Sequence, residues 1–296
     1  MPEQILAASI VLTTPILLAA MGGLINRQSG IVNIGLEAEI LAGALVAVIV
    51  SSATGSWLLA CLAALLTGTV IGWLFALTIT RGQANMIVAG LGLNVLVAGG
   101  IGFILSWQYG TSGTLRLPDV VLLPHVLPEA LGGVPLLGRM LSGLDPLTLL
   151  AWATVAAMPF VLADTRFGLR LRATGNAPQV ARALGLDGLR IQEATTAIAG
   201  ALSGLAGAHL ALASIGLFNE GLSGGRGFIA LAAFYFGRDK PWPTALVCLM
   251  FGFLDATQIR LQTAGLPPKL IGAIPYVMVL AALIVASIRN KKRNET

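Results

Sequence analysis

Charged residues are scarce in this sequence: Asp, Glu, Lys and Arg together make up 10% of the 296 residues, whereas hydrophobic residues make up 56%. Soluble domains carry about a quarter charged residues, and no stretch of this chain keeps a soluble composition over the length of a domain. Stretches of about 20 apolar residues instead recur from end to end, each long enough to cross a bilayer core. The composition therefore predicts one membrane domain over residues 1–296.

Cysteine and histidine are also sparse. Cys61 and Cys248 lie in apolar stretches without metal-type or redox-type spacing, so we interpret them as small packing residues. His125 and His209 form no metal-type cluster, and His209, inside a span, is typical of an interhelical hydrogen bond. The chain also lacks a Gly-x-x-x-x-Gly-Lys-Ser/Thr phosphate loop. We therefore expect no enzyme activity, no metal, no cofactor and no ATP hydrolysis by this chain itself.

The apolar stretches predict an all-α polytopic membrane helix bundle of about eight to ten crossings, with one or two discontinuous helices. We expect spans at about 5–25, 31–50, 57–80, 86–106, 146–163, 193–216, 218–237, 243–262 and 270–288. No basic residue precedes the first stretch, which predicts a retained span rather than a signal peptide. Glycines interrupt 218–237, so it can be a short or discontinuous helix, which membranes tolerate only where protein or a watery cavity satisfies the freed backbone. Glycine pairs at four-residue spacing, Gly68 with Gly72 and Gly200 with Gly204, predict close helix packing.

The basic residues predict the orientation of these spans. If the loop at 164–192 is cytoplasmic, five of the 18 Lys and Arg residues fall outside or in the outer half of a span: Arg116, Arg139, Arg226, Arg260 and Lys269. The other 13 (18 minus 5) lie inside, as the positive-inside rule favours. This arrangement requires 218–237 to cross, an external N-terminus and a cytoplasmic C-terminus. The net charge of +5 lacks the aromatic interleaving of a nucleic-acid surface, so we expect no nucleic-acid partner.

The loop at 164–192 is the most distinctive polar segment. Asn176 is a suitable N-cap, Pro178 suits the first turn of a helix, and Gly185 can end that helix in the left-handed conformation. A rigid helix of about two turns, at about 177–184, could dock into a groove on a cytoplasmic partner and transmit its motion. The alternative is an amphipathic connector that only joins two spans.

Several segments, in order along the chain, resemble one family. Residues 166–185, RFGLRLRATGNAPQVARALG, resemble the coupling loop of the ABC importer permeases for simple sugars and nucleosides, which are related to branched-chain amino-acid permeases. Residues 30–37, GIVNIGLE, resemble the signature Gly-x-x-Asn-Ile-Gly-x-Glu-Gly, although Ala38 replaces its last glycine. Residues 225–238, GRGFIALAAFYFGR, resemble the glycine-rich segment that ends in Phe-Gly-Arg, and Pro275-Tyr276 resembles a late Pro-Tyr pair.

The resemblance implies the transmembrane subunit of an ATP-driven importer, with nucleosides as the first expected solute and simple sugars such as ribose, or branched-chain amino acids, as alternatives. It implies a second permease subunit (the same or a related one), two cytoplasmic ABC ATPase subunits that use the ATP, and an external solute-binding protein. The location it implies is the bacterial inner membrane, in contact with lipid. The residues of the coupling loop that it assigns to the ATPase contact are Arg172, Asn176, Pro178, Ala181, Arg182 and Gly185.

Polar residues inside the spans are candidates for the solute path. An ionisable residue there costs ~2.5–3.5 kcal/mol on insertion scales for Asp or Lys, so Glu37 is expected to be interior and functional. Asn33 lies four residues earlier on the same helix face, whereas Glu39 points away, and Asn94 belongs to another span. We expect Asn33, Glu37 and Asn94 to line the path; the alternative is that they only join helices. Phe228 offers a ring on which a base or sugar could stack, or it simply packs.

Two other functions are compatible with a polytopic bundle. A secondary transporter needs an ionisable cluster at mid-membrane to bind a coupling proton or sodium ion, and the sequence indicates none. A structural membrane-assembly protein leaves the loop at 164–192 without a role. An ATPase gene with a phosphate loop, adjacent to a gene for a lipoprotein-type binding protein, would favour the importer.

Overall fold

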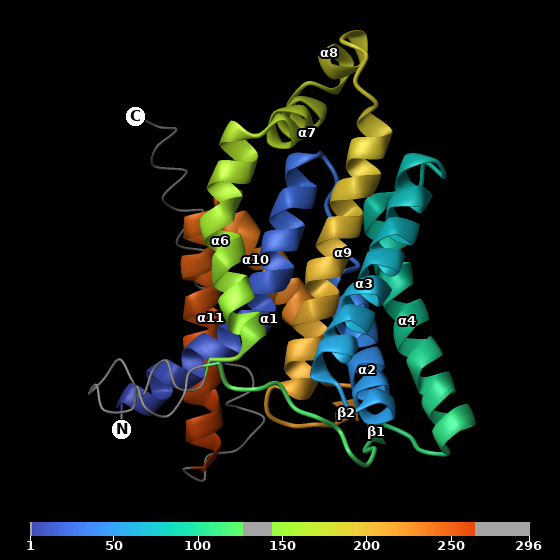
Figure 1. Ribbon diagram of the computed structural model, residues 1–296. Coiled ribbons are helices and arrows are strands. Elements are labelled where there is room, and N and C mark those ends of the chain that lie inside the picture. The colour runs from blue at the N-terminus through green and yellow to red at the C-terminus, as the bar shows by residue number, and fades with distance from the viewer. Residues whose placement is uncertain (1, 127–143, 264–296) are drawn as a thin grey trace.

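The computed structural model describes residues 2–126 and 144–263, which form a bundle of helices that run between two opposite ends (Figure 1). The helices are α1 (Pro2–Gln28), α2 (Leu36–Thr54), α3 (Trp57–Thr80), α4 (Met86–Tyr109), α6 (Pro146–Asp164), α7 (Arg166–Asn176), α8 (Pro178–Ala183), α9 (Gly188–Leu212), α10 (Arg226–Phe236) and α11 (Pro241–Thr263). Among the described residues, seven of these helices are long and apolar enough to cross a membrane. The predicted multi-pass helical membrane fold is confirmed. The span expected at 270–288 lies outside the described residues.

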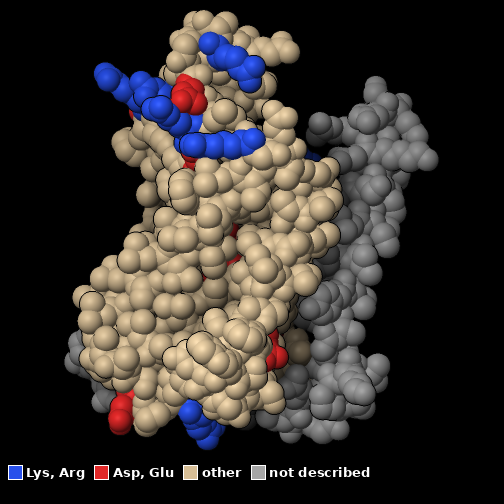
Figure 2. All heavy atoms as spheres, turned by 90° about the vertical axis from the view of Figure 1, so that its right-hand side faces the viewer, with Lys and Arg blue, Asp and Glu red and all other residues tan. Residues whose placement is uncertain are grey.

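The two ends of the bundle differ in structure. Helices α7 and α8 stand above the bundle as an arm (residues 165–187) between α6 and α9, and we call this end the arm end. At the other end, strands β1 (Thr114–Leu115) and β2 (Phe218–Asn219) pair antiparallel as a short ribbon, and we call this the ribbon end. Figure 2 shows Lys and Arg side chains gathered at the arm end, whereas the surface between the two ends carries few charged side chains. This is the distribution expected of a protein whose middle lies in lipid.

The chain traverses the bundle in two similar units of opposite direction. In the first, α1 runs toward the arm end, an extended segment at 29–35 turns back into the bundle, α2 continues to the ribbon end, and α3 returns. In the second, α9 runs toward the ribbon end, the non-helical segment 213–225 turns back, α10 continues to the arm end, and α11 returns. α3 packs against α9 as α11 packs against α1. This is an inverted repeat, a common architecture of membrane transport proteins.

Glycine gives the helices of the core their close approach. Gly68 of α3 lies directly against the backbone of Gly200 on α9, and a Cβ on Gly72 would lie 2.6 Å from the carbonyl oxygen of Thr196. One turn further along α9, Gly204 lies against the carbonyl group of Ala64. The small-residue pairs therefore act as predicted, because without a Cβ two backbones can meet where lipid supplies no hydrophobic drive for association.

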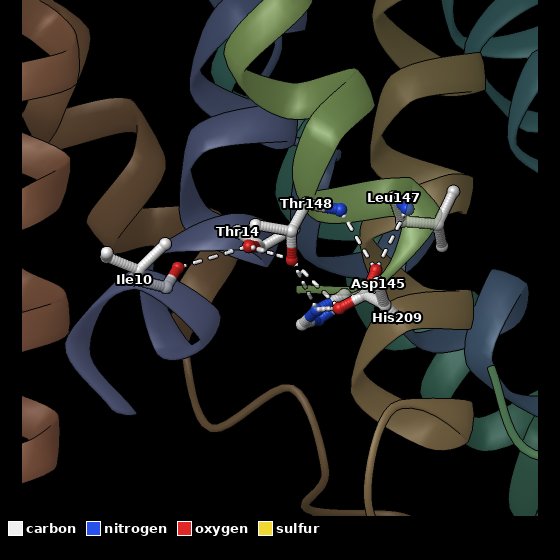
Figure 3. A network of polar contacts seen from close by, with 6 residues as sticks. All are labelled: Ile10, Thr14, Asp145, Leu147, Thr148 and His209. Carbon is white, nitrogen blue, oxygen red and sulfur yellow. Dashed lines mark hydrogen bonds and ion pairs between the residues drawn. The ribbon is translucent and has the colours of Figure 1, made fainter. Parts of the chain in front are cut away.

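A buried polar network fastens three helices in the ribbon half of the bundle (Figure 3). Asp145 caps α6 by accepting from the N–H groups of Leu147 and Thr148, and His209 of α9 donates from Nε2 to Asp145 Oδ2 over 3.0 Å. Thr148 shares a 2.9 Å hydrogen bond with Thr14 of α1. Burial opposes ionisation of Asp145, but the hydrogen bond and charge of His209, with the hydrogen bonds from Thr148, outweigh it and lower the Asp145 pKa to about 2. The predicted interhelical role of His209 is confirmed.

Ion pairs close the bundle at the arm end. Arg27, at the end of α1, pairs with Asp239 after α10 over 2.6 Å, and its guanidinium lies 3.9 Å from the centre of the Tyr235 ring. Arg81, just after α3, donates to both carboxylate oxygens of Glu193 near the start of α9. These contacts fix the ends of the helices from which the arm and the interior segments depart.

Candidate functional site

Two helices begin inside the bundle instead of at its surface, and their starting points meet. Residues 29–35 are not helical, so α2 begins at Leu36, later than the predicted span at 31–50. The span predicted at 218–237, which the glycines marked as short or discontinuous, contains a short helix: β2 and a series of turns precede α10, which covers only 226–236. At 1.5 Å per residue its 11 residues are ~16 Å long, about half of a ~30 Å bilayer core. The first turns of both helices therefore expose N–H groups in the interior.

Glu37 satisfies the start of α10. Its Oε1 accepts from the hydroxyl of Ser223 and from the N–H of Gly225 (3.0 Å), and its Oε2 accepts from the N–H of Gly227 (2.8 Å). A Cβ on Gly227 would lie only 2.5 Å from the backbone nitrogen of Glu37 and 2.7 Å from its Cα. Glycine at 227 thus lets the first turn of α10 reach the backbone of α2. A carboxylate suits this place, because the positive end of the helix dipole and three donors converge on it.

Asn94 and Asn33 satisfy the start of α2. Asn94 of α4 accepts from the N–H of Ala38 and donates to the carbonyl oxygen of Ile34, both over 3.0 Å. Asn33 accepts from the N–H of Gly35 and donates to Glu39 Oε1, each over 2.8 Å. Asn33 and Glu39 are fully buried. Side chains of three elements therefore close a break that would otherwise leave several backbone groups unpaired in the membrane.

The four predicted pathway residues are brought together at this junction of α2, α4 and α10. Asn33 is enclosed by the chain itself, whereas Glu37 and Asn94 are half-buried, and Phe228 in the first turn of α10 is 45% exposed. The three polar side chains form hydrogen bonds with backbone groups at the starts of α2 and α10. Their contact with a solute, and that of Phe228, stays a prediction.

The junction also contains charges that the sequence left unconnected. Arg226, the first residue of α10, donates to Asp255 of α11 over 3.1 Å, and both side chains are largely buried. Together with Glu37 they place three ionisable groups around the start of α10. Each has a partner: Arg226 pairs with Asp255, and Glu37 is held by neutral donors. The spacing of 29 residues between Arg226 and Asp255 gave no signal in the sequence.

The arm contains two helices instead of the single one that was predicted. The hydroxyl of Thr165 accepts from the N–H of Gly168 and starts α7, which continues to Asn176. Asn176 is therefore the last residue of α7 and not the predicted N-cap; the cap of α8 is Ala177, without a side-chain hydrogen bond. Pro178 opens α8 as predicted. Gly185 follows its end with φ +79°, which confirms the predicted left-handed conformation.

The outer surface of α8 is apolar at its tip. Val180 and Leu184, one turn apart, are 58% and 75% exposed, whereas Ala181 faces inward with 2% exposure. Arg182, next to this apolar pair in sequence, is exposed. Arg172 belongs to α7, is half-buried, and donates to the carbonyl oxygen of Ala163 at the end of α6. The sequence motif thus located the helix but not the side of it that is free for contact.

The set of donors that meets Glu37 at the start of α10 is the part of the site that sequence reasoning missed. Ser223 and Gly227 are ordinary residues of a glycine-rich segment, and only the return of the chain beside α2 gives them a shared partner. The one available signal was an acidic residue in one interrupted span and a glycine cluster in another.

The chain is similar to known proteins over most of its length. The model of a family described as "branched-chain amino acid transport system / permease component" matches residues 5–283. The guanosine ABC transporter permease protein NupQ of Bacillus subtilis (strain 168) is 32% identical over 291 residues, which cover 94% of this chain and 90% of that protein. The nucleoside ABC transporter permease protein NupC of Lactococcus lactis subsp. cremoris is 31% identical, covering 95% of this chain and 91% of that protein. The glucose ABC transporter permease protein TsgB13 of Haloferax volcanii is 27% identical, covering 92% and 74%. The chain therefore belongs to the family of permease components typified by branched-chain amino acid transport systems.

Proposed function

We propose that this chain is the transmembrane subunit of an ATP-driven importer of nucleosides. The observation that carries the proposal is the arm: a short helix held away from the bundle by two spans, with an apolar tip at Val180 and Leu184. An exposed apolar pair on a rigid helix is suited to a groove on a partner protein. In this proposal the partners are two cytoplasmic ATPase subunits, which bind the arm and use the ATP, so the chain itself needs no cofactor.

The family supports a proposal for the rest of the importer. A second permease subunit, identical or related, would complete the solute path beside the junction of α2, α4 and α10, and a binding protein would deliver solute at the ribbon end. The arm end, rich in basic side chains, would be cytoplasmic in a bacterial inner membrane, with the C-terminus on the same side. Nucleosides are proposed because two relatives more than 30% identical are nucleoside or guanosine permeases. The glucose permease relative makes a sugar the second candidate.

Two experiments test these proposals. Cells that express the chain with its neighbouring ATPase and binding protein should take up labelled nucleoside, and unlabelled nucleoside should compete better than ribose, glucose or leucine. Competition by a sugar or an amino acid alone would refute nucleoside import. A cysteine at Leu184 should crosslink to the ATPase, whereas a cysteine at the exposed Asp119 near the ribbon end should not. The native Cys61 and Cys248 are buried and leave a low background.

A further inference from the structure

The contact between Glu37 and α10 is unusual because it joins two units of the repeat through one carboxylate. Three donors of α10 and its preceding turn, the Ser223 hydroxyl and the N–H groups of Gly225 and Gly227, all point at the two oxygens of Glu37. We call these three donors the anion socket. No residue of α10 itself supplies an acceptor for them in these contacts. The position of α10 relative to α2 therefore depends on a side chain that belongs to the other unit.

Glu37 differs from its neighbour Glu39 in how firmly it is enclosed. Glu39 is fully buried among α2, α3 and α9, accepts from Asn33, and lies close to Gly72. Glu37 is only half-buried, and the residue that follows the socket, Phe228, is 45% exposed. The socket is thus less deeply enclosed than the site of Glu39, so a small anion can reach it through less packed protein.

We propose that Glu37 is a positioning residue for transport: its carboxylate occupies the anion socket and thereby holds α10, with the exposed Phe228, in place against α2. The helix dipole and the three donors act on the carboxylate together, and a neutral amide would turn one donor toward another donor. Without the carboxylate, the start of α10 loses the contact that holds it against α2. The segment before it is non-helical and provides no helical continuation that could hold it instead. The role in transport rests on the function proposed above.

Chemical rescue tests the socket directly. In the complete transporter, Glu37→Ala should lower nucleoside uptake roughly tenfold, the factor that ~1.4 kcal/mol represents. Formate or acetate in the assay should restore much of the loss by occupying the socket, whereas neutral formamide should not. Formate should also raise the melting temperature of the purified Glu37→Ala complex and leave that of the wild type unchanged.

Glu39→Ala is the matched control, because it removes the same side chain two residues away on the same helix. Its carboxyl site is fully buried, so formate should restore neither uptake nor melting temperature. If Glu37→Ala fails to assemble, Glu37→Asp, which keeps the charge, should transport better than Glu37→Gln. Normal uptake by Glu37→Ala, equal effects of formate and formamide, or Gln above Asp would overturn the proposal. A formate-dependent melting shift of the Glu37→Ala complex, together with a wild-type transporter that imports no nucleoside, would support the socket and refute only the proposed solute.

Discussion

Gly200→Ala should destabilise the protein, although alanine is the better helix former. The new Cβ would lie 2.9 Å from the carbonyl carbon of Gly68 and 3.1 Å from the Cα of Gly72, with the Gly68 carbonyl oxygen closer still. These are backbone atoms of a packed helix, so no rotamer change can relieve the contact and α3 must move away from α9. Overpacking of a tight core costs ~1–3 kcal/mol, and the helix-propensity gain of alanine over glycine offsets up to ~1 kcal/mol of it. We expect a net loss on the order of 2 kcal/mol, because the obstructing atoms place this site at the upper end of the range.

Gly99→Ala on α4 isolates the packing effect. A Cβ at Gly99 meets no heavy atom within 4 Å, so only the propensity term remains and the variant should gain up to ~1 kcal/mol. Equilibrium unfolding of the purified chain in mixed detergent micelles gives both free energies under one condition. The two variants should therefore differ in sign. Equal stabilities, or a Gly200→Ala protein as stable as wild type, would refute the close contact of α3 with α9.

Three further outcomes can be checked independently. Cysteines at Asp119 and Arg182 should react with impermeant reagents from opposite sides of the membrane, the latter from the cytoplasm, and labelling from one side would contradict the proposed orientation. Asp145→Asn should lower the unfolding free energy on the order of 2 kcal/mol. His209 helps to hold the Asp145 pKa at about 2, below its unfolded value, so this contribution is complete above that value and lost only as the pH falls toward 2. In thermal denaturation, the loss measured at pH 5 should shrink as the pH falls toward 2. Gly185→Val should reduce uptake without preventing assembly, because a β-branched residue resists φ +79°, and unchanged uptake would count against the coupling role.

The sequence predicted most of the fold because a bilayer makes local composition decisive. Long apolar runs gave the long helices within a few residues, and small residues at a four-residue spacing predicted close packing, although not that Gly68 would meet Gly200. The interior starts of α2 and α10 were less predictable. Residues 31–35 are apolar enough to continue a span, and their extended conformation depends on hydrogen bonds from Asn33 and from Asn94, 61 positions further along the chain.

The candidate site was predicted in its residues but not in their roles. Glu37 was identified because an ionisable carboxyl inside a span is costly. Its partners, however, lie 186 to 190 residues away in a segment without an obvious anion-binding motif. In the arm, Pro178 and Gly185 marked the ends of α8 correctly, since backbone geometry alone decides their places. Asn176 was assigned wrongly because α7, started by Thr165, extends over it. Local capping rules do not decide whether a residue between two adjacent helices ends the first or caps the second.

Helix α6 brings the chain back to the arm end before α9 begins (Figure 1). The chain traverses the bundle along α1, α2, α3 and α4, and so returns to the ribbon end where it began; α6 then adds a single traverse before α9. Each unit makes three traverses, so a unit that directly followed α3 would already be inverted, and α4 and α6, as a pair of traverses, preserve that inversion. Two copies of one design that enter the membrane from opposite sides give each face its own interrupted helix, α2 directed to one and α10 to the other.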